Sequence, residues 1–432
     1  MLLSFQVSNH KSIRGEQTLH LQPVYDKTRP ALPVAAIFGA NAAGKSNVLD
    51  ALHFMVDAVR NSFVSWRAGV PHTPFRFDRT SENAGSTFVV DLLLDGVRYT
   101  YGIAVDAHSV LEEWLHTYPQ HRRRVIFERR GQVVTPGPVA GLARGQVKAL
   151  ADVMPRTALF LSVAGDGLLD QLAPVHRWFR SGIDIIPIAT AVVDEQALIE
   201  RLENAKDRNR LVGLLVAADV GVVDVEVEHL LPAELYAKTG LDLGQLVEGG
   251  VDAETARQLL ARFDQTLERL KQGSTEKRLT FVHDRDRVRM SFADESHGTK
   301  VWLSYIGPLL DALDSGGALV VDELDTSLHP HLMAQLIGLF HNPDTNPHNG
   351  QLVFTTHDTS LLGRYFNDRI LARDEIWFTA KNNAHETELF SLAEFKARED
   401  DSVQRRYLTG TYGAVPLPNE HVFGDALRDR SA

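Results

Sequence analysis

GANAAGKSNVLDAL, residues Gly39–Leu52, follows the apolar run VAAIF and fits the pattern G-x-x-x-x-G-K-[ST] without exception. Apolar residues then recur at helical spacing through NVLDALHFMVDAV, so the motif joins a strand to an amphipathic helix. Such a loop turns backbone N–H groups toward a phosphate, and the helix adds the positive end of its dipole. The residues expected to surround bound phosphates are Gly39, Ala40, Asn41, Ala42, Ala43, Gly44, Lys45, Ser46 and Asn47.

Two acidic residues supply the second half of the expected site. The apolar run ALVV leads into Asp322 and Glu323 at the carboxyl end of a strand, where open α/β sheets bind ligands. Lys45 would reach the β- and γ-phosphates of a nucleotide, while Ser46 and Asp322 would hold Mg²⁺. Glu323 would polarise the attacking water as a general base. The expected ligands are therefore ATP and Mg²⁺.

A histidine follows a third buried strand. The run LVFTT is followed directly by His357, at the point where that strand leaves the sheet. We expect this side chain to hydrogen-bond the γ-phosphate and to sense its presence. Lys45, Glu323 and His357 are thus the expected catalytic residues.

The composition is that of an ordinary globular protein of 432 residues, 44% hydrophobic and 23% charged. No apolar run reaches ~18 residues, so no membrane partner is expected. The N-terminus is too polar after Phe5 for a secretion signal, and the lack of cysteine excludes disulfides and thiolate metal sites, which favours a cytoplasmic protein. The net charge of −11 argues against general binding to the DNA backbone. The basic stretch His121–Arg130 suits either a solvated hairpin edge or a contact with nucleic acid or a partner.

The pattern along the chain indicates an α/β fold in three parts. Residues 1–193 hold the phosphate loop and an alternating segment with the turn Asp95-Gly96, which predicts an antiparallel β subdomain. Residues 194–273 have helical spacing and predict a helical insertion, either packed on the main domain or free to bind a partner. Its second half has an apolar stripe of Leu259, Leu260, Phe263, Leu267 and Leu270. Residues 274–432 return to strands and predict a mostly parallel sheet.

Four motifs together resemble a known family. They are the glycine-rich loop, DESHGTK at Asp294–Lys300, VVDELDTSLHP at Val320–Pro330, and TTHD. In this order they resemble the ABC-type ATPase heads of the SMC, Rad50 and OLD group. The later segments LFLSVAG, DEIWFTAKN, TELFSL and RRYLTGTYGAVP are similar to compact bacterial ATPases of the RloA and OLD types, which are often encoded in phage-defence or toxin–antitoxin-like operons.

The resemblance assigns roles to further residues. It implies that Ser296 and Gly298 begin a helix that binds the γ-phosphate held by a second subunit, and that Asp325 and Ser327 cross the dimer seam. It also implies that Lys11 lies near the phosphates. A homodimer with ATP at its interface is therefore expected, and a higher oligomer remains open. The sequence departs from the family at His10, where Phe is usual, and in its signature ESHGT, and it has no convincing Q-loop glutamine.

Several cellular functions are compatible with such an ATPase. A transporter subunit would need membrane partners, and a self-contained nuclease would need an acidic metal site for which little chain remains after His357. The favoured hypothesis is a nucleotide-gated dimeric switch that controls a separately encoded effector, a nuclease or toxin, in anti-phage defence. The alternative is a DNA-binding ATPase of the repair type.

Overall fold

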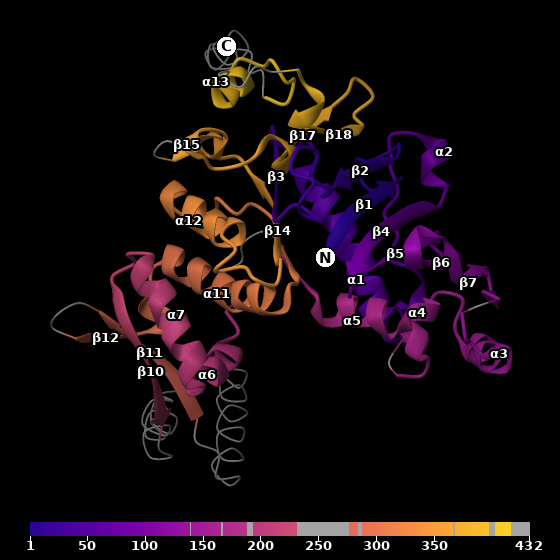
Figure 1. Cartoon of the computed structure of the whole chain (residues 1–432), viewed down its shortest axis with the longest axis horizontal. Coiled ribbons are helices and arrows are strands. Elements are labelled where there is room, and N and C mark those ends of the chain that lie inside the picture. Colours follow the sequence, from indigo (N-terminus) through magenta and orange to yellow (C-terminus); the bar gives the residue numbers. More distant parts are fainter. Residues whose placement is uncertain are drawn as a thin grey trace, which may run out of the picture. The chain divides into compact units, whose positions relative to one another are not determined.

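The computed structural model describes residues 1–138, 140–165, 167–187, 193–230, 276–283, 287–365, 368–396 and 402–415. The chain divides into two compact units, whose elements are labelled in Figure 1. The first unit consists of Met1–Thr190 together with Pro308–Ala432, and the second is the intervening segment Ala191–Gly307. The first unit therefore draws its sequence from both ends of the chain.

The first unit contains a mostly parallel sheet of six strands. In chain order they are β3 (Val34–Gly39), β9 (Ile183–Ile186), β13 (Ala318–Val321), β14 (Gln351–Thr356), β17 (Ile376–Lys381) and β18 (Thr387–Ser391). Their spatial order is β18-β17-β3-β14-β13-β9, and only β18 runs antiparallel to its neighbour. Every residue of β3, β13 and β14 is buried, which confirms the predicted sheet covered on both faces.

An antiparallel sheet of seven strands completes the framework of the first unit. Its strands are β1 (Leu2–Ser8), β2 (Gln17–His20), β4 (Ser86–Leu94), β5 (Val97–Val105), β6 (Val110–Thr117), β7 (Arg124–Arg130) and β8 (Val133–Pro136). Their order is β2-β1-β4-β5-β6-β7-β8. The predicted hairpin joins β4 to β5 through Asp95 and Gly96, with φ angles of 49° and 76°. Positive φ at both positions is what a tight two-residue hairpin turn requires.

Helix α1 (Lys45–Ser65) ties the two sheets together. Its apolar face includes Leu52 and Met55, which belong to one hydrophobic core with Ile37 of β3 and Phe88 of β4. Burial of this stripe fixes the direction in which the helix leaves the glycine-rich loop. The other α-helices and strands described in this unit are α2 (Arg79–Glu82), α3 (Arg144–Val153), α4 (Phe160–Ala164), α5 (Ala173–Ser181), α12 (Pro330–His341), α13 (Val403–Leu408), β15 (Arg364–Tyr365) and β16 (Asp368–Arg369).

The second unit contains helices and a small antiparallel sheet. The helices α6 (Glu195–Glu203) and α7 (Ala205–Ala217) lie in the first part of the segment predicted to be helical. They pack on β10 (Val222–Leu230), which pairs with β11 (Glu276–His283), and β11 pairs with β12 (Val288–Ser291). The sequence analysis did not foresee strand β10, and the apolar stripe from Leu259 to Leu270 lies outside the described residues. Helix α11 (His297–Ser315) begins in this unit.

A buried ion pair anchors the antiparallel sheet to the helices. Glu113 of β6 and Arg129 of β7 are both fully inaccessible, and Nη1 of the arginine donates to Oε2 of the glutamate at 3.2 Å. The hydroxyl of Tyr101 and the backbone N–H groups of Phe160 and Leu161 also donate to the Glu113 carboxylate. Every charge in this cluster is thus compensated. The cluster joins β5, β6 and β7 to the first turn of α4, which packs on α1.

We predict that Glu113→Ala lowers the free energy of unfolding by about 3–5 kcal/mol, because it leaves the guanidinium of Arg129 buried without its counter-charge. The matched control is Glu112→Ala on the same strand, whose exposed pair with Arg130 spans 3.8 Å and should contribute at most about 0.5 kcal/mol. Urea denaturation followed by tryptophan fluorescence measures both. Equal losses in the two variants would refute the anchoring role.

Candidate nucleotide-binding site

The glycine-rich loop lies between β3 and α1, as its sequence predicts. Strand β3 ends at Gly39 and helix α1 begins at Lys45. Ala42 and Gly44 adopt positive φ angles of 62° and 104°. A Cβ atom on Gly44 would lie 2.1 Å from Oγ1 of Thr387, so both the backbone angle and the surroundings require glycine there.

The side chain of Lys45 is held inside this loop. Lys45 is only 5% exposed, and its ammonium donates to the carbonyl oxygens of Gly39 at 2.9 Å and Ala40 at 3.3 Å. It also lies 3.0 Å from Nε2 of His357. Because an ammonium can only donate, this imidazole nitrogen accepts the hydrogen bond. The structure therefore brings together Lys45 and His357, two of the three predicted catalytic residues.

Three carboxylates interact electrostatically with the ammonium group of Lys45. Burial lowers the pKa of Lys45, and the negative charges of Glu323, Asp325 and Asp322 oppose that shift. All three acids follow the carboxyl end of β13, beside β14 and one strand removed from β3. The charge of Lys45 is thus stabilised by an acidic segment that lies far from it in the sequence.

A hydrogen-bond chain connects Ser46 to Glu323 through a residue that the sequence analysis missed. Oδ1 of Asp322 accepts from the Ser46 hydroxyl at 3.1 Å and from the Thr355 hydroxyl at 2.6 Å. Oγ1 of Thr355 in turn accepts from the backbone N–H of Glu323 at 2.7 Å. Thr355 is wholly buried in β14. Its sequence signal is weak: it is the first of two threonines that follow the apolar run LVF, two positions before His357.

The segment after Asp322 turns sharply and faces His357. Glu323 has a positive φ of 54°, and its Oε1 lies 3.8 Å from Nε2 of His357. Thr326 Oγ1 lies 3.4 Å from Oε2 of Glu323. Asp325 accepts the backbone N–H of His357 at 3.2 Å, and its second carboxylate oxygen is buried without a partner among the described residues. Ser327 is exposed and also has a positive φ, of 65°.

A second missed feature supports the loop from the C-terminal part of the chain. Oγ1 of Thr387, the first residue of β18, donates to the carbonyl of Ala43 at 2.9 Å. The same oxygen lies 2.7 Å from the Ser12 hydroxyl, which accepts from Nδ2 of Asn47 at 2.6 Å. This group, Thr387, Ser12 and Asn47, clamps the loop around Gly44. We call it the loop brace.

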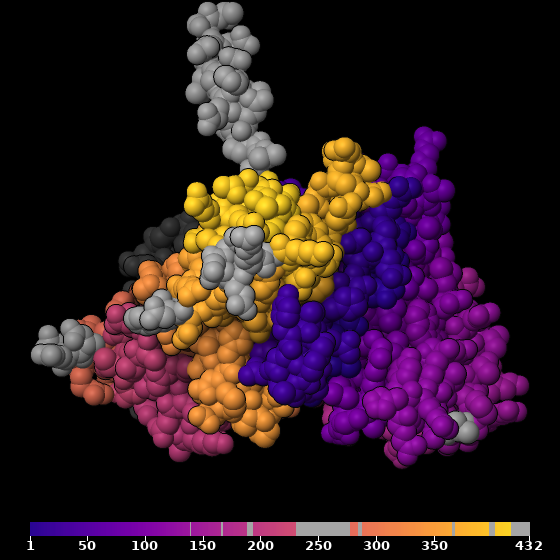
Figure 2. Space-filling model, turned by 45° about the horizontal axis from the view of Figure 1, so that its top comes forward, coloured from indigo at the N-terminus to yellow at the C-terminus, as the bar shows by residue number. Residues whose placement is uncertain are grey.

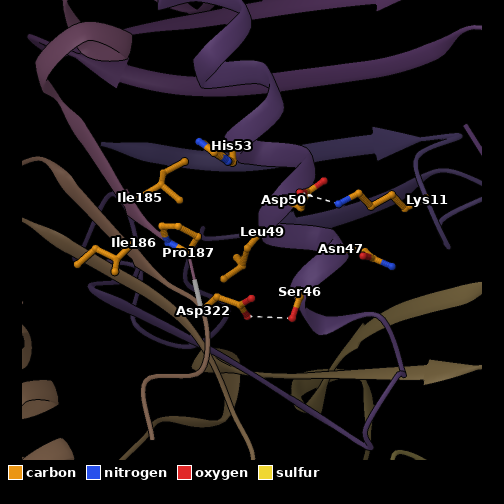
Figure 3. A pocket seen from close by; sticks show the side chains of 10 residues that line it. All are labelled: Lys11, Ser46, Asn47, Leu49, Asp50, His53, Ile185, Ile186, Pro187 and Asp322. Carbon is orange, nitrogen blue, oxygen red and sulfur yellow. Dashed lines mark hydrogen bonds and ion pairs between the residues drawn. The ribbon is translucent and has the colours of Figure 1, made fainter. Parts of the chain in front are cut away.

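A cavity of about 370 Å³ opens beside Ser46 and Asp322 (Figure 3). Lys11 lines it, but its ammonium pairs with Asp50 at 2.7 Å. Burial would raise the pKa of Asp50, yet hydrogen bonds from His10 and Lys11 outweigh it and bring that pKa to about 2. The apolar wall of the cavity consists of Leu49, Ile185, Ile186 and Pro187. Lys11 therefore shares a cavity with the predicted metal ligands without contacting them.

The donor set at this position suits Mg²⁺. Ser46 and Asp322 offer hard oxygen ligands 3.1 Å apart. The described residues contain no group of three or more His, Asp or Glu side chains arranged to hold a metal ion. Mg²⁺ in nucleotide sites takes one or two protein ligands and completes its shell with phosphate oxygens and water, so the pair fits that ion better than a metal needing a full protein cage.

The predicted signature residues belong to the second unit. The hydroxyl of Ser296 accepts the backbone N–H of Thr299 at 3.1 Å and lies 2.8 Å from its hydroxyl. Ser296 therefore caps the start of α11, and Gly298 lies in the first turn of that helix. The predicted position at a helix N-terminus is present.

The strand–loop–helix junction, with its buried lysine and facing acidic segment, is the arrangement of a P-loop protein. The chain belongs to the family described as "AAA domain, putative AbiEii toxin, Type IV TA system", whose model matches residues 34–132 and 172–363. No curated protein sequence matches the chain.

Two solved structures of Smc heads are among those similar to the chain. One is the SmcHead bound to the C-winged helix domain of ScpA, at 11% identity and a TM-score of 0.40, covering 90% of this chain and 97% of that one. The other is the Smc head domain with an extended coiled coil bound to the C-terminal domain of ScpA derived from Pyrococcus furiosus, at 10% identity and a TM-score of 0.39. It covers 91% of this chain and 97% of that one. No helix among the described residues is long and apolar enough to cross a membrane.

We predict that Thr355→Val lowers the free energy of unfolding by about 1–3 kcal/mol, because valine keeps the shape but removes the donor to the buried Asp322 carboxylate and the acceptor of the Glu323 N–H. Thr355→Ser keeps the hydroxyl and should lose clearly less stability. Chemical denaturation of the three proteins tests this. If serine proved no better than valine, the hydrogen-bond chain would not be what Thr355 contributes.

Proposed function

We propose that this chain binds and hydrolyses ATP with Mg²⁺. The observation that carries the proposal is the convergence of Lys45, Ser46, Asp322, Glu323 and His357 at the carboxyl edge of one parallel sheet. These residues come from three segments that are distant in sequence. Ligands of open α/β sheets bind at this edge, and membership of the AAA family supports the same activity.

Each residue has a distinct part in the proposed reaction. Lys45 and the loop N–H groups would bind the β- and γ-phosphates, and Ser46 with Asp322 would hold Mg²⁺. When bound, the metal ion supplies positive charge to the phosphate oxygens. Glu323 would orient a water molecule and accept its proton as the water attacks the γ-phosphate. Thr355 would fix the relative positions of Asp322 and Glu323, since it is hydrogen-bonded to both.

The proposed active form is a homodimer with ATP at the interface. Its support is the Ser296–Gly298 segment at the start of α11, which matches the family's signature position and presents a helix N-terminus suited to an anion. In this arrangement the signature of one subunit would contact the γ-phosphate bound by the loop of the other. Hydrolysis would remove that shared charge and release the dimer.

The proposed output is control of a separately encoded effector, a nuclease or toxin, in anti-phage defence. The family description, which names a putative AbiEii toxin and a Type IV toxin–antitoxin system, supports a defence context. A DNA-binding ATPase is the second candidate. Three exposed arginines favour it, Arg122, Arg123 and Arg124 at the start of β7, although Arg123 is paired with Glu128 and Arg129 of the same basic stretch is buried.

We predict that Glu323→Gln keeps ATP affinity, slows hydrolysis by about 10²–10⁴-fold, and accumulates as a dimer with ATP and Mg²⁺. The amide retains the size of the side chain but cannot accept the proton. Light scattering at micromolar protein concentration and phosphate release measure the two effects. Lys45→Ala is the control and should lose ATP binding, because it removes the buried cation of the loop.

The two parts of this prediction can fail separately. A Glu323→Gln protein that binds ATP and remains monomeric would rule out the shared site. A rate reduced by less than about tenfold would remove Glu323 from the role of general base. ATP binding that persists in Lys45→Ala would overturn the assignment of the phosphate loop.

We predict that tagged Glu323→Gln protein recovered from its native host carries a stoichiometric nuclease- or toxin-like protein. The variant is used because the ATP-bound state would persist during purification. Mass spectrometry and nucleic-acid staining identify what is bound, with Lys45→Ala as the matched control. Recovery of DNA alone, lost in the control, would favour the DNA-binding function instead.

A further inference from the structure

A buried acidic side chain lies directly before the signature segment Ser296–Gly298. The side chain of Glu295 is only 2% exposed, and Glu295 is the residue before Ser296. Its Oε1 lies 2.6 Å from Nε2 of His283, the last residue of β11. Because a carboxylate oxygen accepts hydrogen bonds, the imidazole is the donor. The end of β11 therefore holds the residue next to the signature, and both residues belong to the second unit.

The burial of Glu295 gives this hydrogen bond its importance. A carboxylate removed from water is costly unless a hydrogen bond or an opposite charge compensates it. His283 supplies that hydrogen bond from a position nearer the solvent, since its own side chain is 19% exposed. Without the imidazole, the carboxylate would be drawn toward water, and Ser296 would move with it because the two residues are adjacent in the chain. The hydrogen bond thus fixes the position of Ser296.

The turn before the signature segment is fastened to the same sheet. The short 3₁₀ turn Phe292–Asp294 follows β12, and the ring of Phe292 lies 6.2 Å from the ring of Phe281 in β11. The hydroxyl of Ser291, the last residue of β12, donates to Oδ2 of Asp294 at 2.6 Å. Side chains of β11 and β12 therefore hold the turn in place.

The helix that follows the signature is held to this turn as well. In the first turn of α11, Nζ of Lys300 donates to the carbonyl of Ala293 at 2.7 Å and lies 5.5 Å from the ring centre of Phe292. Nε1 of Trp302 donates to the carbonyl of Leu214 in α7 at 3.2 Å. Helices α6 and α7 contact the sheet, and in Figure 2 the pink residues of this helical segment lie beside red-orange residues of β11 and β12. The signature segment thus lies within one connected framework.

The strand that carries His283 is supported on both sides. Strand β11 is central in its sheet, and His283 lies opposite Val222 of β10 and Val288 of β12. Glu226 of β10 pairs with Arg289 of β12 at 2.7 Å, so an ion pair spans β11 from one neighbour to the other. A central strand cannot shift without breaking ladder hydrogen bonds on both of its edges. His283 is therefore a fixed point.

We propose that His283 is a positioning residue for the signature. Its hydrogen bond to Glu295 holds Ser296 and Gly298 where they meet the γ-phosphate bound by a second subunit. The inference rests on the proposed function, since it takes ATP to be shared between two subunits. His283 does not touch the nucleotide, and the phosphate loop belongs to the first unit. Loss of the hydrogen bond therefore weakens ATP-dependent dimerisation and leaves ATP binding by the monomer unchanged.

The test compares two amides that differ in reach. Both are placed in the Glu323→Gln protein, which should accumulate as the ATP-bound dimer. His283→Gln places an amide N–H near the position of Nε2, whereas His283→Asn is one carbon shorter and does not reach Glu295. In sedimentation velocity with Mg-ATP, His283→Asn should need roughly 10- to 100-fold more protein to dimerise, the range for one lost hydrogen bond to a charged group. His283→Gln should need at most about threefold more, because it keeps that donor.

The matched control is His341→Asn in the same Glu323→Gln protein. Nε2 of His341 lies 2.8 Å from Oε1 of Glu375, whose side chain is 3% exposed, so this pair has the same chemistry and a similar burial. It lies in the first unit, and His341 shares a small cavity with Gln351 at the start of β14, the sheet edge opposite to the phosphate loop. His341→Asn should dimerise like its parent. Calorimetry with Mg-ATP, below the concentration at which dimers form, should give one affinity for all of these proteins.

Each outcome decides one part of the proposal. A Glu323→Gln parent that stays monomeric with ATP would overturn the shared site of the proposed function, and the positioning role with it. Dimerisation of His283→Asn at the concentration of its parent would overturn the positioning role and leave the ATP dimer standing. The positioning role would also be overturned if His283→Gln or His341→Asn were as weak as His283→Asn. Weaker ATP binding by monomeric His283→Asn would likewise overturn it, because the effect would then be a general one on the fold.

Discussion

The hydrogen bond between Ser46 and Asp322 is the contact on which the site depends. It joins the first turn of α1 to the end of β13, and Thr355 extends it to the backbone of Glu323. Because Asp322 and Thr355 are buried, a displaced partner would leave a polar group without solvent to replace it. Separating the phosphate loop from the acidic segment would therefore cost free energy, because the hydrogen bonds between them would be lost without replacement by water.

The topology of the sheet makes this contact possible. Strand β3 lies between β14 and β17, which come from the other end of the chain. On one side β14 brings Thr355 and His357 to the acidic segment, and on the other the hairpin of β17 and β18 brings Thr387 to the loop. The glycine-rich motif alone is a flexible loop with a helix behind it. Its neighbours give it a defined shape.

The sequence predicts the parts of the site that are local in the chain. The motif from Gly39 to Ser46, the turn at Asp95 and the buried runs before Asp322 and His357 all carry short-range signals, and the structure has the corresponding elements. Strand β10 has a period-two alternation, DVEVEH, but lies in a segment dominated by helical spacing. Thr355 and the loop brace could not be found this way, because pairing between residues as distant as Ala43 and Thr387 depends on strand order, which no local pattern contains.

The central position of β3 has a consequence during synthesis. Its partners β14 and β17 follow it by about 320 and 340 residues, so at translation rates of about 5–20 residues per second they arrive ~16–70 s later. For that time an apolar strand, built to be buried on both faces, has neither neighbour and remains a template for pairing with other chains. A nascent chain of this topology is therefore exposed to mispairing at β3 until its C-terminal strands emerge.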